Sequence, residues 1–132
     1  MAISASAAMA LIAIIYRITI NLPDMPFSPN LKNKTSTDFI DSSQQVMDAI
    51  NFLIQPIPGF HNVTVKEFRY QQVVGTMVIM DILSTNIHDI ESFKKLFQDS
   101  IQEGHIGWLA VAPEGFELLT MKGFSFSNFS FR

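Results

Sequence analysis

An alternation of apolar and polar residues is the first clear pattern in the chain, over residues 16–22. Apolar side chains fall on one side of an extended backbone there: Tyr16, Ile18, Ile20 and Leu22. Polar side chains fall on the other side: Arg17, Thr19 and Asn21. This period of two predicts a strand with one buried face. Pro23 ends the strand, because proline has no N–H to donate to a sheet.

Apolar residues at steps of three and four predict a first amphipathic helix over residues 35–54. These residues are Phe39, Ile40, Val46, Met47, Ile50, Leu53 and Ile54. Thr35 and Asp38 have the spacing of a capping box, so we expect the helix to begin near Thr35. Pro56 cannot continue a helix and marks its end.

A second helix is predicted over residues 89–103 by the same spacing of apolar residues. We expect Asn86 to cap its start, and Gly104 to end it, because glycine readily adopts the left-handed conformation found just past helix ends. The sequence offers two places for a last strand, residues 109–112 and residues 116–122.

Two strands are predicted between the helices, over residues 61–70 and 73–83. An odd step between the apolar residues Val65 and Phe68 indicates a bulge in the first of them. The second is almost continuously apolar, as a central strand is. The resulting order of elements predicts an α+β fold, the ferredoxin-like split βαββαβ sandwich, with an antiparallel four-stranded sheet and two helices on one face.

We divide the chain into three parts. Residues 1–15 form a hydrophobic leader or flexible N-terminal segment, residues 16–125 form the folded domain, and residues 126–132 form a C-terminal tail. Residues 2–15 are uncharged, but they are too few to cross a bilayer as a helix. They also lack the basic start of a signal peptide. A signal or anchor remnant remains the alternative for this segment.

Composition narrows the classes of function. The chain has 132 residues, 48% of them hydrophobic, which suits one domain with its own core. It has no cysteine and a net charge of −3, which excludes thiolate chemistry and argues against nucleic acid as a partner. The three histidines have no metal-ligand spacing: His61, His88 and His105. We therefore expect no catalytic residues, metal or cofactor. Trp108 is expected in the core, or partly exposed beside Pro113.

Three Asn-x-Ser/Thr triplets are candidate sites of N-glycosylation, at Asn33, Asn62 and Asn128. Asn33 precedes a predicted helix and Asn62 begins a predicted strand, so we expect both to be accessible. Asn128 lies in the tail. Use of these sites requires passage through the secretory pathway.

Residues 122–129 imitate an RNA-recognition signature, Lys-Gly-Phe followed by further phenylalanines. In RNA-binding proteins of this fold class, such aromatic residues lie on the third strand of the sheet and stack on bases. Here the third strand, over residues 73–83, has no aromatic residue. RNA binding through residues 122–129 is therefore kept only as an alternative.

The sequence resembles a SEA domain across residues 16–125. The segments that carry the resemblance are Arg17–Leu22, Phe27–Ser36, Asp38–Phe39, Val63–Arg69 and Asn86–Glu91. In character it is closest to SEA modules of membrane-tethered cell-surface mucins, in particular those of large ovarian-type mucins that lack a cleavage motif. The resemblance implies an extracellular, N-glycosylated module that stands close to a membrane.

Many SEA domains cut their own chain at a Gly-Ser turn between the second and third strands. In this sequence Gln71 and Gln72 hold the Gly-Ser position, and glutamine has no hydroxyl to attack the peptide. A shifted alignment offers Gly75 and Thr76 instead. We expect no self-cleavage, and cleavage by Thr76 remains the alternative.

The predicted function is that of a non-catalytic extracellular SEA module in a mucin-like, membrane-associated glycoprotein. It would act as a glycosylated spacer and as an interaction domain for protein or carbohydrate partners at the cell surface. We expect the domain to be monomeric and its parent protein to be membrane-anchored. The alternatives are a self-cleaving SEA domain and an intracellular RNA-binding module.

Overall fold

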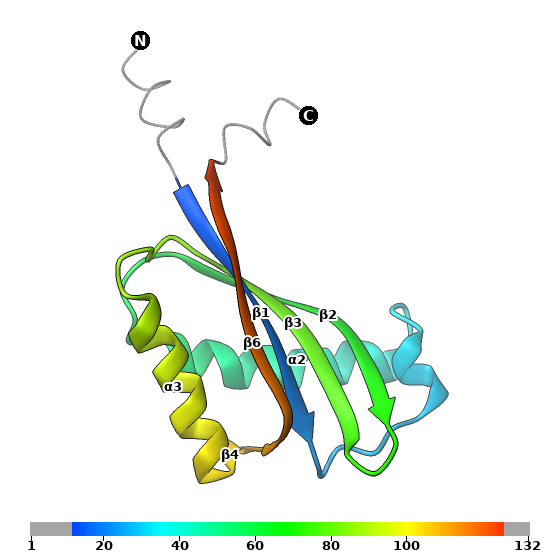
Figure 1. Ribbon diagram of the computed structural model, residues 1–132. Coiled ribbons are helices and arrows are strands. Elements are labelled where there is room, and N and C mark those ends of the chain that lie inside the picture. Colours follow the sequence, from blue (N-terminus) through cyan, green and yellow to red (C-terminus); the bar gives the residue numbers. More distant parts are fainter. Residues whose placement is uncertain (1–11, 126–132) are drawn as a thin grey trace.

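A computed structural model describes residues 12–125 of the chain, in which one antiparallel sheet is covered by two helices on one face (Figure 1). The strands lie in the order β2-β3-β1-β6, so the two strands that are central are not consecutive in the chain. This order is that of the split βαββαβ arrangement. The prediction of an α+β fold with both helices on one face is confirmed.

Strand β1, Ile12–Leu22, begins four residues before the strand predicted from Tyr16. Residues 12–15 therefore belong to the sheet rather than to a leader that precedes it. Ala13 is fully buried and pairs with Phe124 of β6, Ala112–Ser125. This long partner strand is the physical reason for the early start, because it supplies backbone hydrogen bonds to residues that show no polar alternation.

Strands β2, His61–Gln71, and β3, Gly75–Ser84, form the predicted hairpin. The pairing register shifts between Val65 and Glu67, which confirms the predicted bulge. Strand β3 lies between β2 and β1, which accounts for its nearly continuous apolar sequence.

The end of the chain contains more strand than was predicted. The short strands β4, His105–Ile106, and β5, Leu109–Ala110, pair with each other outside the main sheet. Of the two places predicted for the last strand, residues 116–122 lie within β6, whereas residues 109–112 are divided between β5 and the start of β6.

Helix α2, Thr37–Ile54, is capped by a different residue from the one predicted. The Oγ of Ser36 accepts a hydrogen bond of 3.1 Å from the backbone N–H of Phe39. Thr35 lies one residue before the N-cap position, and its hydroxyl donates to Oδ1 of Asn33 at 2.8 Å. The 3-10 helix η1, Pro29–Lys32, lies just before α2.

Helix α3, Ile90–Glu103, ends as predicted at Gly104, whose φ of 92° is left-handed. The predicted cap at its start is wrong. Asp89 is the N-cap residue, with no side-chain capping bond, while Nδ2 of Asn86 donates to the carbonyl of Pro58 at 3.0 Å. Asn86 therefore ties the loop before α3 to the loop after α2.

The core lies between the sheet and the helices. Its largest fully buried side chains come from both layers: Tyr16, Phe68, Phe93, Phe97, Ile18, Ile20, Leu22, Ile50, Ile54, Met80, Ile82 and Ile106. Tyr16 of β1 stacks on Phe93 of α3, with ring centroids 3.9 Å apart, and Phe68 of β2 forms a T-shaped pair with Phe39 of α2. Aromatic pairs from the sheet therefore fix both helices on it.

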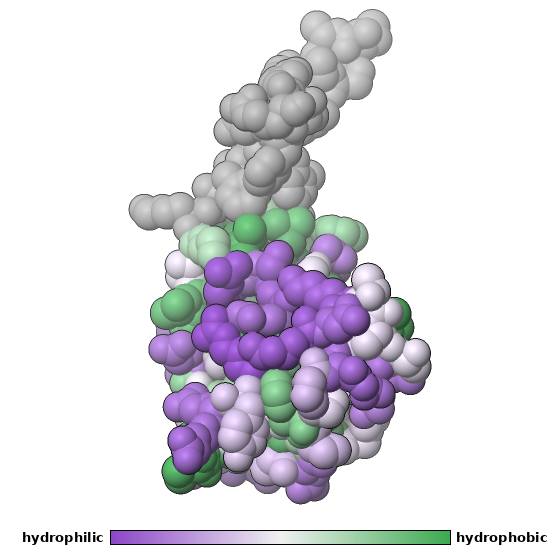
Figure 2. Space-filling model, turned by 90° about the vertical axis from the view of Figure 1, so that its right-hand side faces the viewer, coloured by the Kyte–Doolittle hydropathy of each residue, from purple (hydrophilic) through white to green (hydrophobic). Residues whose placement is uncertain are grey.

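The sheet face away from the helices, here called the polar sheet face, carries charged side chains with a few apolar ones, such as Ile79 and Leu119, among them. Arg17 donates two hydrogen bonds, of 2.7 and 2.8 Å, to the carboxylate of Asp81 on the neighbouring strand. Arg69 pairs with Glu67 along β2. Figure 2 looks from the side on which β2 lies in Figure 1, and hydrophilic residues gather over much of it. A band of hydrophobic residues lies toward the end where β1 begins and β6 ends.

The tip of the β2–β3 hairpin holds a strained residue. Val73 has a φ of 76°, and its side chain is 97% exposed. The left-handed region costs a residue with a Cβ about 1–2 kcal/mol, and β-branching makes valine a poor choice there. The side chain gains no burial in return.

We predict that Val73→Gly stabilises the domain by about 0.5–1 kcal/mol, because relief of the strain exceeds the backbone entropy that glycine loses on folding. Urea unfolding would show this as a higher midpoint at unchanged slope. Val74→Gly is the control, since Val74 has no positive φ, and we expect it to lower the midpoint. A lower midpoint for Val73→Gly would contradict the prediction.

Tyr16 makes the core sensitive to alkaline pH. Burial raises its pKa from 10.0 to about 12, with smaller contributions from Asp89 and Glu91. In the unfolded chain this tyrosine loses its proton near pH 10, whereas the folded protein keeps the proton to about pH 12. The free energy of unfolding therefore falls as the pH rises from 10 to 12.

We predict that Tyr16→Phe removes this part of the alkaline loss. Among the described residues the Tyr16 hydroxyl has no hydrogen-bond partner, so the substitution should leave stability at pH 7 nearly unchanged. Thermal unfolding at pH 7, 10 and about 11.5 measures both effects. Tyr70→Phe is the matched control, because Tyr70 is exposed, and this variant should lose as much stability at alkaline pH as the wild type. Equal alkaline losses in all three proteins would refute the role of Tyr16.

Candidate functional site

The β2–β3 turn is the first candidate site, because the resemblance to SEA domains implies that a cleavage position would lie there. Gln71 pairs with Gly75, so the loop consists of residues 72–74. The backbone N–H of Val74 donates to the carbonyl of Gln71 at 3.0 Å and closes the turn. Gln72 is exposed and offers an amide where self-cleavage requires a hydroxyl.

Thr76, the alternative nucleophile, lies inside the sheet rather than in the turn. It pairs with Tyr70 on one side and with Leu22 on the other. Only 3% of its surface is exposed, and its hydroxyl donates a 2.7 Å hydrogen bond to the carbonyl of Met25. The strained φ of the turn belongs to Val73, three positions earlier in the chain. The strain and the hydroxyl are therefore on different peptides.

Asn21 holds the turn from the neighbouring strand. Its Nδ2 donates to the carbonyl of Val74 at 3.3 Å, and only 3% of its surface is exposed. A Cβ added to Gly75 would lie 3.5 Å from its Oδ1. The sequence assigned Asn21 only to the polar side of β1, and no local pattern indicates that it reaches a turn more than fifty residues away.

The glycosylation candidates do not converge on one site. Asn33 is exposed before α2, and its Oδ1 accepts hydrogen bonds from the backbone N–H and the hydroxyl of Thr35 at 3.0 and 2.8 Å. These bonds do not use Nδ2, the atom to which a glycan is attached. Asn62 is exposed on the edge strand β2. Asn128 lies outside the described residues.

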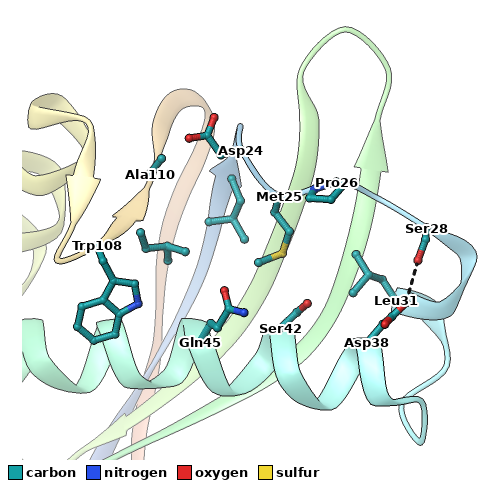
Figure 3. A pocket seen from close by; sticks show the side chains of 12 residues that line it. Asp24, Met25, Pro26, Ser28, Leu31, Asp38, Ser42, Gln45, Trp108 and Ala110 are labelled. Carbon is teal, nitrogen blue, oxygen red and sulfur yellow. Dashed lines mark hydrogen bonds between the residues drawn. The ribbon is translucent and has the colours of Figure 1, made fainter.

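A groove beside α2 is the second candidate site, and its volume is about 470 Å³ (Figure 3). Its walls are α2, the segment after β1 and the β4–β5 hairpin. The lining residues are Leu22, Asp24, Met25, Pro26, Ser28, Leu31, Asp38, Ser42, Gln45, Trp108, Leu109 and Ala110. They come from segments far apart in the sequence, which explains why no local pattern indicated this groove.

Trp108 is 67% exposed at one end of this groove, so it is not a core residue. Strands β4 and β5 are joined by only Gly107 and Trp108, and Gly107 has a φ of 59°. Glycine at the first position is typical of a type II′ turn, which displays the second residue at the hairpin tip. The pair Gly107-Trp108 between Ile106 and Leu109 was the sequence feature that could have indicated this turn.

The polar sheet face holds a second hollow, of about 420 Å³, between charged residues of both signs. Two of the four basic residues that line it, Arg17 and Arg69, are paired with carboxylates. No single class of ligand is favoured by this mixture of charges.

The described residues contain no group of three histidine, cysteine, aspartate or glutamate side chains that could hold a metal ion. The only interaction found for a histidine ring nitrogen there is that of His61 Nε2 with the carbonyl of Ile57, at 2.9 Å. No helix within residues 12–125 is long and apolar enough to span a membrane. Of the RNA-like segment 122–129, residues 126–129 lie outside the described part.

Comparison with protein families relates the observed fold to a known domain. The family model for the SEA domain matches residues 14–105, from β1 to the start of β4. A comparison with curated proteins finds no match. SEA domains are generally non-catalytic and typically extracellular modules. Because the matched residues make up well over half of the chain, and their helices and strands follow the order expected of that domain, this protein belongs to the SEA domain family.

Proposed function

We propose that this SEA domain is an uncleaved extracellular module of a mucin-like, membrane-associated glycoprotein. It would act as a glycosylated spacer and as an interaction domain for other molecules at the cell surface. Similarity to the modules of large ovarian-type mucins is part of the same proposal. The main observation behind the proposed uncleaved state is the position of Thr76. This residue has the nearest hydroxyl after the turn, and it lies inside the sheet.

The chemistry of self-cleavage supports the uncleaved state. An N-to-O acyl shift needs a hydroxyl oxygen close to the carbonyl carbon of a strained peptide. The Thr76 hydroxyl is buried and donates to Met25, and the strained residue is Val73. Cleavage would require Thr76 to leave its pairing with Tyr70 and Leu22. Its hydrogen bond to Met25 would be lost as well.

The accessibility of two acceptor sites supports the glycan-bearing role. Asn33 and Asn62 are exposed on different elements, so glycans on both would project from separate places on the domain. Attached glycans are bulky and strongly hydrated. They would keep neighbouring molecules away from the faces on which they lie.

We predict one full-length chain with two or three used glycosylation sites when residues 1–132 are secreted from mammalian cells behind a cleavable signal. The intact mass is measured under denaturing conditions after enzymatic removal of N-glycans. Enzymatic release converts each glycosylated asparagine to aspartate, so one spectrum counts the used sites and shows whether the chain is whole. Two fragments separated between Gly75 and Thr76 would establish the self-cleaving alternative instead.

Paired substitutions at the third position of a triplet provide the control. Thr64→Val should remove one conversion by destroying the Asn62 site, while Thr64→Ser should keep it, because serine also supports the triplet. Thr76→Val should leave the mass pattern unchanged apart from the substitution itself. A full-length chain with no conversions would overturn the glycan-bearing role and favour an intracellular protein.

A further inference from the structure

We propose that the groove beside α2 binds a short extended peptide segment of a partner protein, with a basic side chain next to an apolar one. This inference concerns a different surface from the hairpin and the glycosylation sites. It does not depend on the proposed function.

The floor of the groove is apolar. Leu22, Leu31 and Leu109 are at least nine-tenths buried beneath it, and Met25 points into its middle from the opposite wall to α2 (Figure 3). A volume of about 470 Å³ is within the range of specific ligand sites. An apolar side chain on this floor would gain the free energy of burial, whereas a hydroxyl-rich ligand would leave polar groups unpaired against it.

The charged residues of the groove are acidic and favour a positively charged ligand. Asp24 and Asp38 are among the twelve lining residues, and none of the twelve is a lysine, arginine or histidine. Oδ2 of Asp38 accepts only neutral donors, from Ser28 at 3.5 Å and Asn30 at 3.3 Å. Within the described part of the chain, neither aspartate forms an ion pair. Asp24 and Asp38 thus lie among the residues that line the groove, and no basic side chain of the described residues is paired with either.

Trp108 supplies an independent feature that favours the same partner. Its indole is exposed at one end of the groove, and the Ser28–Asp38 pair lies at the other end (Figure 3). Tryptophan is the best aromatic partner for an ammonium or guanidinium group. It is also enriched among the residues that dominate binding at protein interfaces.

The dimensions of the groove fit a few extended residues. Asp38 and Gln45 are seven positions apart on α2, which corresponds to about 10 Å along the helix. Three extended residues span about the same length. Ser42 and Gln45 line the groove between its two ends and offer hydrogen-bonding groups to a peptide backbone. These features together favour a peptide over a saccharide.

Trp108 is the only tryptophan in the chain, so its fluorescence reports directly on the groove. The full chain is titrated with the blocked peptide acetyl-Leu-Arg-Leu-Lys-amide, with acetyl-Leu-Gln-Leu-Gln-amide as the neutral control and lactose as the saccharide probe. We expect a saturable change with the basic peptide and at least about fivefold weaker binding of the neutral one. Raising the salt to about 0.5 M should weaken binding of the basic peptide.

Matched variants locate the binding. Asp24→Asn and Asp38→Asn should each lower the affinity for the basic peptide by about fivefold. Glu117→Gln makes the same change of charge on the other face of the sheet and should leave the affinity unchanged. Trp108→Ala, followed by calorimetry, should weaken binding by about tenfold or more. Circular dichroism confirms that each variant is folded.

Three outcomes would overturn the proposal. One is the absence of a saturable response to the basic peptide. Another is equal weakening by Glu117→Gln and by the groove substitutions, which would indicate only a general attraction to an acidic domain. The third is a saturable, salt-independent response to lactose without a response to the basic peptide, which would identify the groove as a saccharide site.

Discussion

The two-residue period of β1 is the constraint on which the rest of the structure depends. Alternate residues of this central strand face opposite sides of the sheet, so Tyr16 and Ile18 enter the core while Arg17 meets Asp81 on the polar face. A slip of one position would bury the guanidinium and expose the tyrosine. Because β3 and β6 both pair with β1, its register also sets which of their residues face the helices.

Patterns within single elements allowed most of the fold to be predicted. The strands and helices follow from periods of two and of three to four residues, and the odd step after Val65 indicated the bulge. The errors arose where a distant residue decides the outcome. Thr35 and Asn86 lie one and three residues before the N-cap positions, and their side chains donate to Asn33 and Pro58. The groove was missed for the same reason, since three separate segments of the chain build it, residues 22–31, 38–45 and 108–110.

The β2–β3 turn differs from a self-cleaving turn in where its strained residue and its hydroxyl lie. A self-cleaving turn needs backbone strain and a hydroxyl at one peptide. In this chain the residue strained by a positive φ is Val73, whereas the hydroxyl belongs to Thr76 and donates to the carbonyl of Met25. Asn21 adds a tie from β1 to the carbonyl of Val74. The turn is therefore fastened from the neighbouring strand and from the segment that follows it.

The pairing of Ile12 with Ser125 has a mechanical consequence. The chain enters and leaves the domain on adjacent antiparallel strands, at the same end of the molecule (Figure 1). Adjacent strands lie about 4.8 Å apart, so the two ends of the folded domain lie close together. A force that pulls these ends apart would load the hydrogen bonds between β1 and β6 one after another rather than all at once. Once unfolded, the chain between residues 12 and 125 could extend to many times the folded distance between its ends.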